Sequence, residues 1–131
     1  MTKLPFGELD EEETQLYDFL LAESPSLSGT SFFITRAAKI GARCKEYADF
    51  FRERYQEFES ASAGDGAHAY LDSDGEVHPM LEAWSADEKH LANFLDECML
   101  SPESRAKFID AIGGSSEEVV KLAEQKAHRF S

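Results

Sequence analysis

The chain has 131 residues, which suits one compact domain and is short for two. It carries 13 Lys and Arg against 26 Asp and Glu, a formal net charge of −13, which argues against binding of nucleic acid or anionic membranes over the whole surface. Any DNA contact therefore requires a separate basic patch.

The sequence has no apolar run long enough to span a bilayer and none of signal-peptide length after Met1. We therefore expect a soluble, cytoplasmic protein that does not contact membranes. The two cysteines, Cys44 and Cys98, lie far apart and form no CxxC pair. Both fall on apolar helical positions, which predicts reduced thiols in the core.

The first predicted element is an acidic helix over Leu9–Ala22. Asp10 and Glu13 have the spacing of a capping box, and Leu9, Leu16 and Leu20 fall on one face. A break follows at Ser24–Gly29, where Pro25 and Gly29 are stop signals.

The second predicted helix, from about Ser31 to Ser60, has the clearest periodicity and would be about 45 Å long. Apolar and aromatic residues recur every three or four positions and form one wide stripe. Such a stripe serves either as core or as a contact with a neighbouring subunit. We predict an oligomer interface from six of its members: Phe33, Ile40, Tyr47, Phe51, Tyr55 and Phe58.

The connector after this helix contains Asp72-Ser73-Asp74-Gly75, which favours a tight turn and a short β-hairpin near residues 69–78, although an irregular loop is nearly as good an interpretation. A third helix is predicted from just after Pro79 to about Met99. A fourth begins with Ser101 as cap and Pro102 in the first turn, and ends at Gly113-Gly114. Ser115 and Glu118 predict a capping box for a last helix that reaches Phe130.

These elements predict an all-α protein of about five helices, one of them long. We divide it into an acidic N-terminal helix and break (residues 1–29), a helix–hairpin–helix oligomerisation core (30–112) and a C-terminal helix (113–131).

The residue patterns give no support for catalysis. Gly64–Ala69 has the spacing of a dinucleotide-binding fingerprint, but a long helix precedes it where a strand is required. His68 and His78 could meet across the hairpin, yet solvated loop histidines are the better interpretation, and Asp72–Glu76 lacks the closing acid of a calcium loop. We expect no enzyme activity, no cofactor and no metal.

One charged segment departs from the acidic background. Arg36, Lys39, Arg43 and Lys45 lie in a ten-residue stretch without any acid, and the first three are spaced to form a ridge beside the apolar stripe. We call these four residues the basic ridge. It is either a DNA-binding edge that contacts phosphates, or a solvated flank that pairs with acids of the first helix or of a neighbouring subunit.

The order of features from Tyr47 to Phe108 is also informative. A helix with Tyr47 and Tyr55 leads through a glycine-containing connector to His78-Pro79, to a helix with Trp84 and Leu91, and to Leu100-Ser101-Pro102-Glu103-Ser104-Arg105. This order resembles the small terminase subunits of tailed double-stranded-DNA bacteriophages, one family of which ends a similar core with Leu-(Thr/Ser)-Pro-x-(Ser/Ala)-Arg. The family tends to have Asn where this chain has His78, and Gly where it has Met99.

The resemblance implies a ring-forming, non-enzymatic adaptor in the host cytoplasm that binds viral double-stranded DNA and regulates the large terminase subunit, which holds the ATPase and nuclease. A ring would repeat the basic ridge many times and so strengthen weak contacts. The leading alternative is an acidic phage-encoded module, a host-takeover or anti-defence factor, that binds proteins and not DNA. A helix-turn-helix regulator built around Ser24–Gly29 is third, and an enzyme is last.

Overall fold

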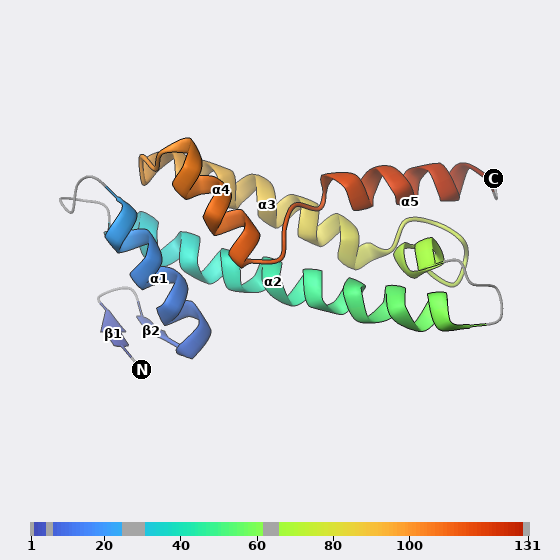
Figure 1. The fold of residues 1–131 in the computed structure, drawn as a ribbon, viewed down its shortest axis with the longest axis horizontal. Coiled ribbons are helices and arrows are strands. Elements are labelled where there is room, and N and C mark those ends of the chain that lie inside the picture. The colour runs from blue at the N-terminus through green and yellow to red at the C-terminus, as the bar shows by residue number, and fades with distance from the viewer. Residues whose placement is uncertain (1, 5–6, 25–30, 62–65, 130–131) are drawn as a thin grey trace.

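A computed structural model describes residues 2–4, 7–24, 31–61 and 66–129 (Figure 1). In these ranges the chain forms five α-helices, so the predicted all-α class is confirmed for them. A 3₁₀-helix and two short strands complete the described elements. In chain order they are β1 (Thr2–Leu4), β2 (Gly7–Leu9), α1 (Glu11–Glu23), α2 (Ser31–Ser60), η1 (Gly66–Tyr70), α3 (Pro79–Glu97), α4 (Pro102–Ala111) and α5 (Glu117–Arg129).

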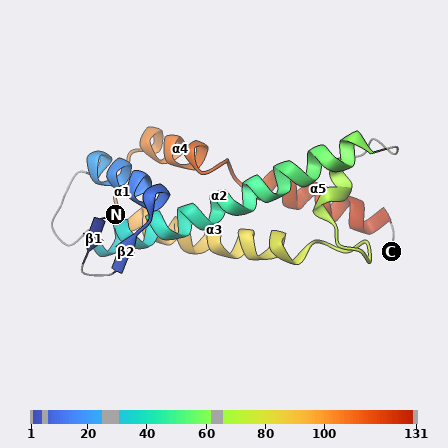
Figure 2. The same ribbon diagram turned by 90° about the horizontal axis from the view of Figure 1, so that it is seen from below.

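The long helix α2 is the axis of the fold, and α3 runs antiparallel beside it (Figures 1 and 2). Helices α1 and α4 lie together at the end where α2 begins, and η1 and α5 pack at the other end. Figure 2 shows α2 and α3 diverging toward that second end, with η1 between them. The molecule is therefore elongated, and its two ends have different neighbours around the same central pair.

The helix boundaries follow the predicted capping residues. The backbone N–H of Glu13 donates to Asp10 Oδ1 at 2.7 Å and that of Asp10 donates to Glu13 Oε1 at 3.0 Å, which is the capping box of α1. Ser101 caps α4 by accepting from the Ser104 N–H at 3.1 Å. Gly113, with φ of 97°, ends that helix in the left-handed region, where glycine is the favoured residue.

The start of α5 is capped differently from the prediction. The Ser116 N–H donates to Oε1 of Glu88 on α3 at 2.5 Å, and the Glu117 N–H donates to the Ser115 hydroxyl at 3.2 Å. The Glu88 carboxylate of the neighbouring helix α3 therefore accepts an N–H group at the start of α5, a role that the predicted capping box gave to the Glu118 carboxylate.

The apolar stripe of α2 lies mostly inside the subunit, which corrects part of the predicted oligomer interface. Ile40 is 3% exposed and Phe51 is 2% exposed. Phe51 stacks on Trp84 of α3 at 6.1 Å between ring centroids, and α3 and η1 cover this side of α2. Ile40 and Phe51 therefore belong to the chain's own core and offer no surface to a neighbouring subunit.

The connector after η1 is held by turn residues and by Arg54. In the segment where the sequence predicts a hairpin, one isolated antiparallel bridge joins Leu71 to Val77. The Asp72 carboxylate accepts the backbone N–H groups of Asp74 at 2.8 Å and Glu76 at 3.0 Å inside this turn. The Arg54 guanidinium donates to the carbonyl oxygens of Ala69 at 3.0 Å and Leu71 at 3.3 Å, which ties the connector to α2.

One buried cluster contains residues from all three predicted segments, among them Leu16, Trp84 and Ala123. Cys44 and Cys98 belong to it as free thiols, which confirms their predicted state, and burial raises their pKa values to about 12 and about 11. Most of the Ser24–Gly29 break and the end of the last predicted helix at Phe130 lie outside the described residues. The antiparallel pair β1 and β2, with Thr2 opposite Leu9, is a feature that we did not predict.

Candidate nucleic-acid interface and subunit contacts

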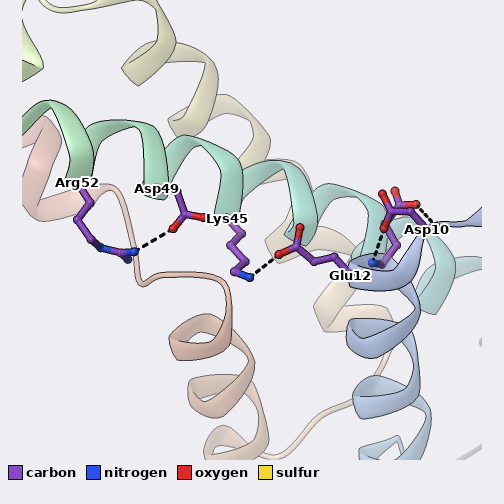
Figure 3. Close-up of polar contacts among 6 residues, drawn as sticks. Asp10, Glu12, Lys45, Asp49 and Arg52 are labelled. Atoms are coloured by element: carbon purple, nitrogen blue, oxygen red, sulfur yellow. Dashed lines mark hydrogen bonds and ion pairs between the residues drawn. The ribbon is translucent and has the colours of Figure 1, made fainter.

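The basic ridge lies on the N-terminal half of α2, next to α1. Lys39 Nζ is 3.9 Å from Glu13 Oε1, and Lys45 Nζ forms an ion pair and hydrogen bond with the Glu12 carboxylate. Figure 3 shows Glu12 of α1 and Lys45 of α2 pointing toward each other across the gap between the two helices. The hydrogen bond to Glu12 raises the pKa of Lys45, so the ammonium form is favoured.

The other side of the ridge faces α3. Arg43 Nε is 3.2 Å from Asp87 Oδ2. The same carboxylate accepts a hydrogen bond from the Tyr47 hydroxyl, and burial together with the negative charge of Asp87 raises the pKa of Tyr47. Asp87 thus joins a ridge cation to a residue of the predicted oligomer interface.

Arg36 has a different environment. Its side chain is exposed, and its guanidinium carbon is 5.9 Å from the centroid of the Phe94 ring on α3. In the described ranges it has an aromatic ring beside it and no carboxylate partner. Three of the four ridge cations are therefore paired with acids of the same chain, two from α1 and one from α3.

This pairing agrees with the predicted alternative of a flank that pairs with acids of the first helix. It also defines how strongly the cations are held. The side chains of Lys39, Lys45 and Arg43 are 30%, 38% and 55% exposed. Ion pairs this exposed contribute only about 0.2–1 kcal/mol each and are screened by salt. A polyanion can therefore compete for these cations without unfolding the chain.

The remaining residues of the predicted oligomer interface lie nearer the surface. Phe33, Tyr47 and Phe58 are half-buried, and Tyr55 is 36% exposed. Tyr55 lines a cavity of about 520 Å³ between the second half of α2 and the start of α5. Its ring also packs over Gly66, where a Cβ atom would lie 2.6 Å from the Tyr55 ring. Tyr55 therefore packs within the chain against η1, including the Tyr70 ring at 5.9 Å between centroids, while part of its surface stays exposed.

An aromatic cluster at the opposite end joins Phe33 of the predicted oligomer interface to Phe32 and Phe94, which were not part of that prediction. Phe32 is 40% exposed and lies 5.5 Å from Phe33 and 6.4 Å from Phe94, measured between ring centroids. The adjacent Phe32-Phe33 pair at the start of the helix could have indicated this exposed ring, because two neighbouring side chains of a helix cannot both point into the core of the protein.

His78 is the N-cap of α3. Its Nδ1 accepts the backbone N–H of Met80 at 3.1 Å, and its ring lies 5.7 Å from Phe50 and 5.5 Å from Phe51. Burial lowers the pKa of His78 below its ordinary value of 6.5, and the charge of Arg54 lowers it further, against the opposing effect of Asp72. The neutral imidazole is the form that can cap the helix, since a protonated Nδ1 has no lone pair to accept with.

The remaining features of the site are structural. The described residues contain no group of three or more side chains suited to holding a metal ion, so His68 and His78 are not joined in such a cluster there. The buried indole N–H of Trp84 has no hydrogen-bond partner in the part of the chain that the structure describes. None of the described helices is both long and apolar enough to cross a membrane.

Comparison with protein-family models, with curated proteins and with solved structures finds no match for this chain.

Proposed function

We propose that this chain is a small terminase subunit of a tailed bacteriophage: a non-catalytic, oligomeric adaptor that binds viral double-stranded DNA and regulates the large terminase subunit during genome packaging in the host cytoplasm. The proposal starts from the resemblance over Tyr47–Phe108. The observation that carries it further concerns the two positions where the chain departs from the family pattern.

The first of these positions is Met99, between α3 and α4. Its φ of 57° places it in the left-handed region, and it is the only described residue other than glycine with a positive φ. Glycine is the residue that this conformation favours after a helix. The left-handed backbone conformation of Met99 is therefore the one that would favour the family's Gly at this position, although this chain has a methionine side chain there.

The second position is His78, the N-cap of α3. Asparagine is among the residues most favoured at an N-cap, because its side-chain oxygen accepts an N–H of the first turn. The His78 ring nitrogen does the same for Met80. Pro79 follows in the first turn, where proline is well tolerated. Both departures thus keep the local structure that the family residues would provide.

The arrangement around these positions also supports the proposal. The antiparallel pair α2 and α3, the connector between them and the Ser101-capped start of α4 occur in the order of the family's helix–hairpin–helix core. An elongated pair with half-exposed aromatic residues suits lateral packing of copies. The interface residues that we retain on α2 are Phe33, Tyr47, Tyr55 and Phe58.

The experiment is a titration of labelled duplex DNA with the purified chain at 50 and 200 mM salt, read by fluorescence anisotropy. We expect binding that weakens steeply with salt, because phosphate contacts release counterions. The variant Arg36→Ala/Lys39→Ala/Arg43→Ala should lose most of the affinity. The matched control Lys89→Ala/Lys107→Ala/Lys121→Ala removes the same charge outside the ridge and should lose much less. Equal losses in the two variants would contradict the ridge as the DNA-binding site.

The second candidate function is an acidic protein-interaction module without DNA binding. The ion pairs of Lys39, Arg43 and Lys45 favour it, because a cation already paired within the chain is a weaker ligand for phosphate. Wild-type chain that binds no duplex at 50 mM salt and captures a basic host protein would favour this candidate over the first.

A further inference from the structure

We propose that α1 is a built-in competitor for DNA phosphates: the carboxylates of Glu12 and Glu13 occupy the phosphate-binding positions beside Lys45 and Lys39, and DNA must displace them to bind. This inference rests on the proposed DNA-binding function and concerns its regulation. It follows from how the first turn of α1 is built and from how the rest of α1 is anchored.

The first turn of α1 is fixed in place by its capping box. Glu13 Oε1 accepts the Asp10 N–H at 3.0 Å and is also the atom that lies 3.9 Å from Lys39 Nζ. Glu12, the residue before Glu13, pairs with Lys45, which lies six residues after Lys39 on α2. Lys39 and Lys45 are therefore about 9 Å apart along the helix axis. Two adjacent acids thus hold two cations that a DNA backbone would need.

The rest of α1 is anchored independently of these ion pairs. Leu16, Tyr17 and Leu20 are buried. At the other end of the helix, the Ser104 hydroxyl donates to Glu23 Oε2 at 2.9 Å and the Ser24 hydroxyl donates to the Cys98 carbonyl at 2.9 Å. Because these contacts do not involve the ridge, α1 stays docked when Lys39 and Lys45 leave the two carboxylates for phosphates.

The arrangement makes binding depend on many copies acting together. Asp87 holds Arg43 in the same way from α3, so Arg36 is the ridge cation without a carboxylate partner in the described ranges. In the part of the chain that the structure describes, the ridge of one subunit then offers DNA one cation that no carboxylate holds. An oligomer that presents several ridges to one duplex can displace the acids of all of them, since linked contacts reinforce one another.

The test compares two charge-matched variants of the full chain. Glu12→Gln/Glu13→Gln removes both competing charges, and a glutamine at position 13 can still accept the Asp10 N–H. Glu118→Gln/Glu124→Gln removes the same charge from exposed positions on α5, at the opposite end of the molecule (Figure 1). Far-UV circular dichroism and light scattering check that helix content and assembly match the wild type.

We expect Glu12→Gln/Glu13→Gln to bind duplex about 2- to 30-fold more tightly than wild type at 50 mM salt, as expected for releasing two exposed ion pairs. The α5 control should gain much less. Adding Lys39→Ala/Lys45→Ala to the Glu12→Gln/Glu13→Gln variant should abolish the gain.

Three outcomes overturn the inference. If wild type binds through the ridge and both charge-matched variants gain equally, α1 has no special role and the proposed function stands. The same conclusion follows if neither variant binds duplex more tightly than wild type. If no variant binds duplex even at low salt, the ridge is not a DNA site and the DNA-binding part of the proposed function fails with the inference.

Discussion

Met99 offers the sharpest test of the backbone argument behind the proposed function. It lies just after α3 with φ of 57°, and it is 67% exposed. A residue with a Cβ atom in the left-handed region carries a strain of about 1–2 kcal/mol. Glycine removes that strain, but the unfolded chain then gains freedom worth about 0.5–1 kcal/mol relative to alanine.

These two effects predict that Met99→Gly is more stable than Met99→Ala by about 0.5–1 kcal/mol. For a chain of this length the difference corresponds to about 2–4 °C in Tm. The comparison with alanine removes the contribution of the methionine side chain, which is small because most of it is in solvent. The measurement is urea unfolding followed by far-UV circular dichroism at one fixed protein concentration.

The control is Ala106, which is exposed within α4. In an ordinary helical position glycine is less stable than alanine by about 0.5–1 kcal/mol, so Ala106→Gly should destabilise. The sign of the Gly-for-Ala effect should therefore reverse between positions 99 and 106. A glycine at position 99 that destabilises as much as the one at position 106 would refute the reasoning.

Three further predictions concern the connector and the helix ends. Because burial and Arg54 keep the pKa of His78 below 6.5 in the folded state, the unfolded chain takes up the proton first, and the free energy of unfolding should fall as the pH drops below 6.5. His78→Asn keeps a cap without this proton, so its pH profile from 7 to 5 should be flatter than that of the wild type, and parallel profiles would argue against the role of His78. Arg54→Lys keeps the charge but loses the forked donation to two carbonyls, which should cost about 1–3 kcal/mol in urea unfolding, and a loss within error of zero would contradict the tie. Gly113→Ala should cost about 2 kcal/mol or more, because φ is 97° and the new Cβ would lie 2.6 Å from that of Ala48, whereas Gly114→Ala, with φ of 90° and open space around it, should lose less in the same assay.

The helix ends were predictable because capping residues that are close together in the sequence determine them. Each cap acts on backbone groups at most four residues away, so the neighbouring residues are enough to place it. This holds for Asp10 with Glu13, for Ser101 with Pro102, and for Gly113. The 30-residue length of α2 was likewise predictable from its unbroken periodicity.

The parts that could not be predicted depend on residues distant in sequence. The apolar stripe of α2 gives no indication of which neighbour covers it. We therefore predicted Ile40 and Phe51 as contacts with a second subunit, whereas both are buried in the core of the same chain. The partner of Arg43, Asp87, is on another helix, and so is Glu88, which caps α5. Such pairs depend on how two helices cross, which the local pattern does not encode.

Light scattering at micromolar concentration gives the mass of the purified chain in solution and so decides whether the chain assembles. The proposed adaptor should have a mass several times that of one 131-residue subunit. A mass that stays at that of a single chain over this concentration range would contradict assembly, and with it the packaging function proposed for this protein.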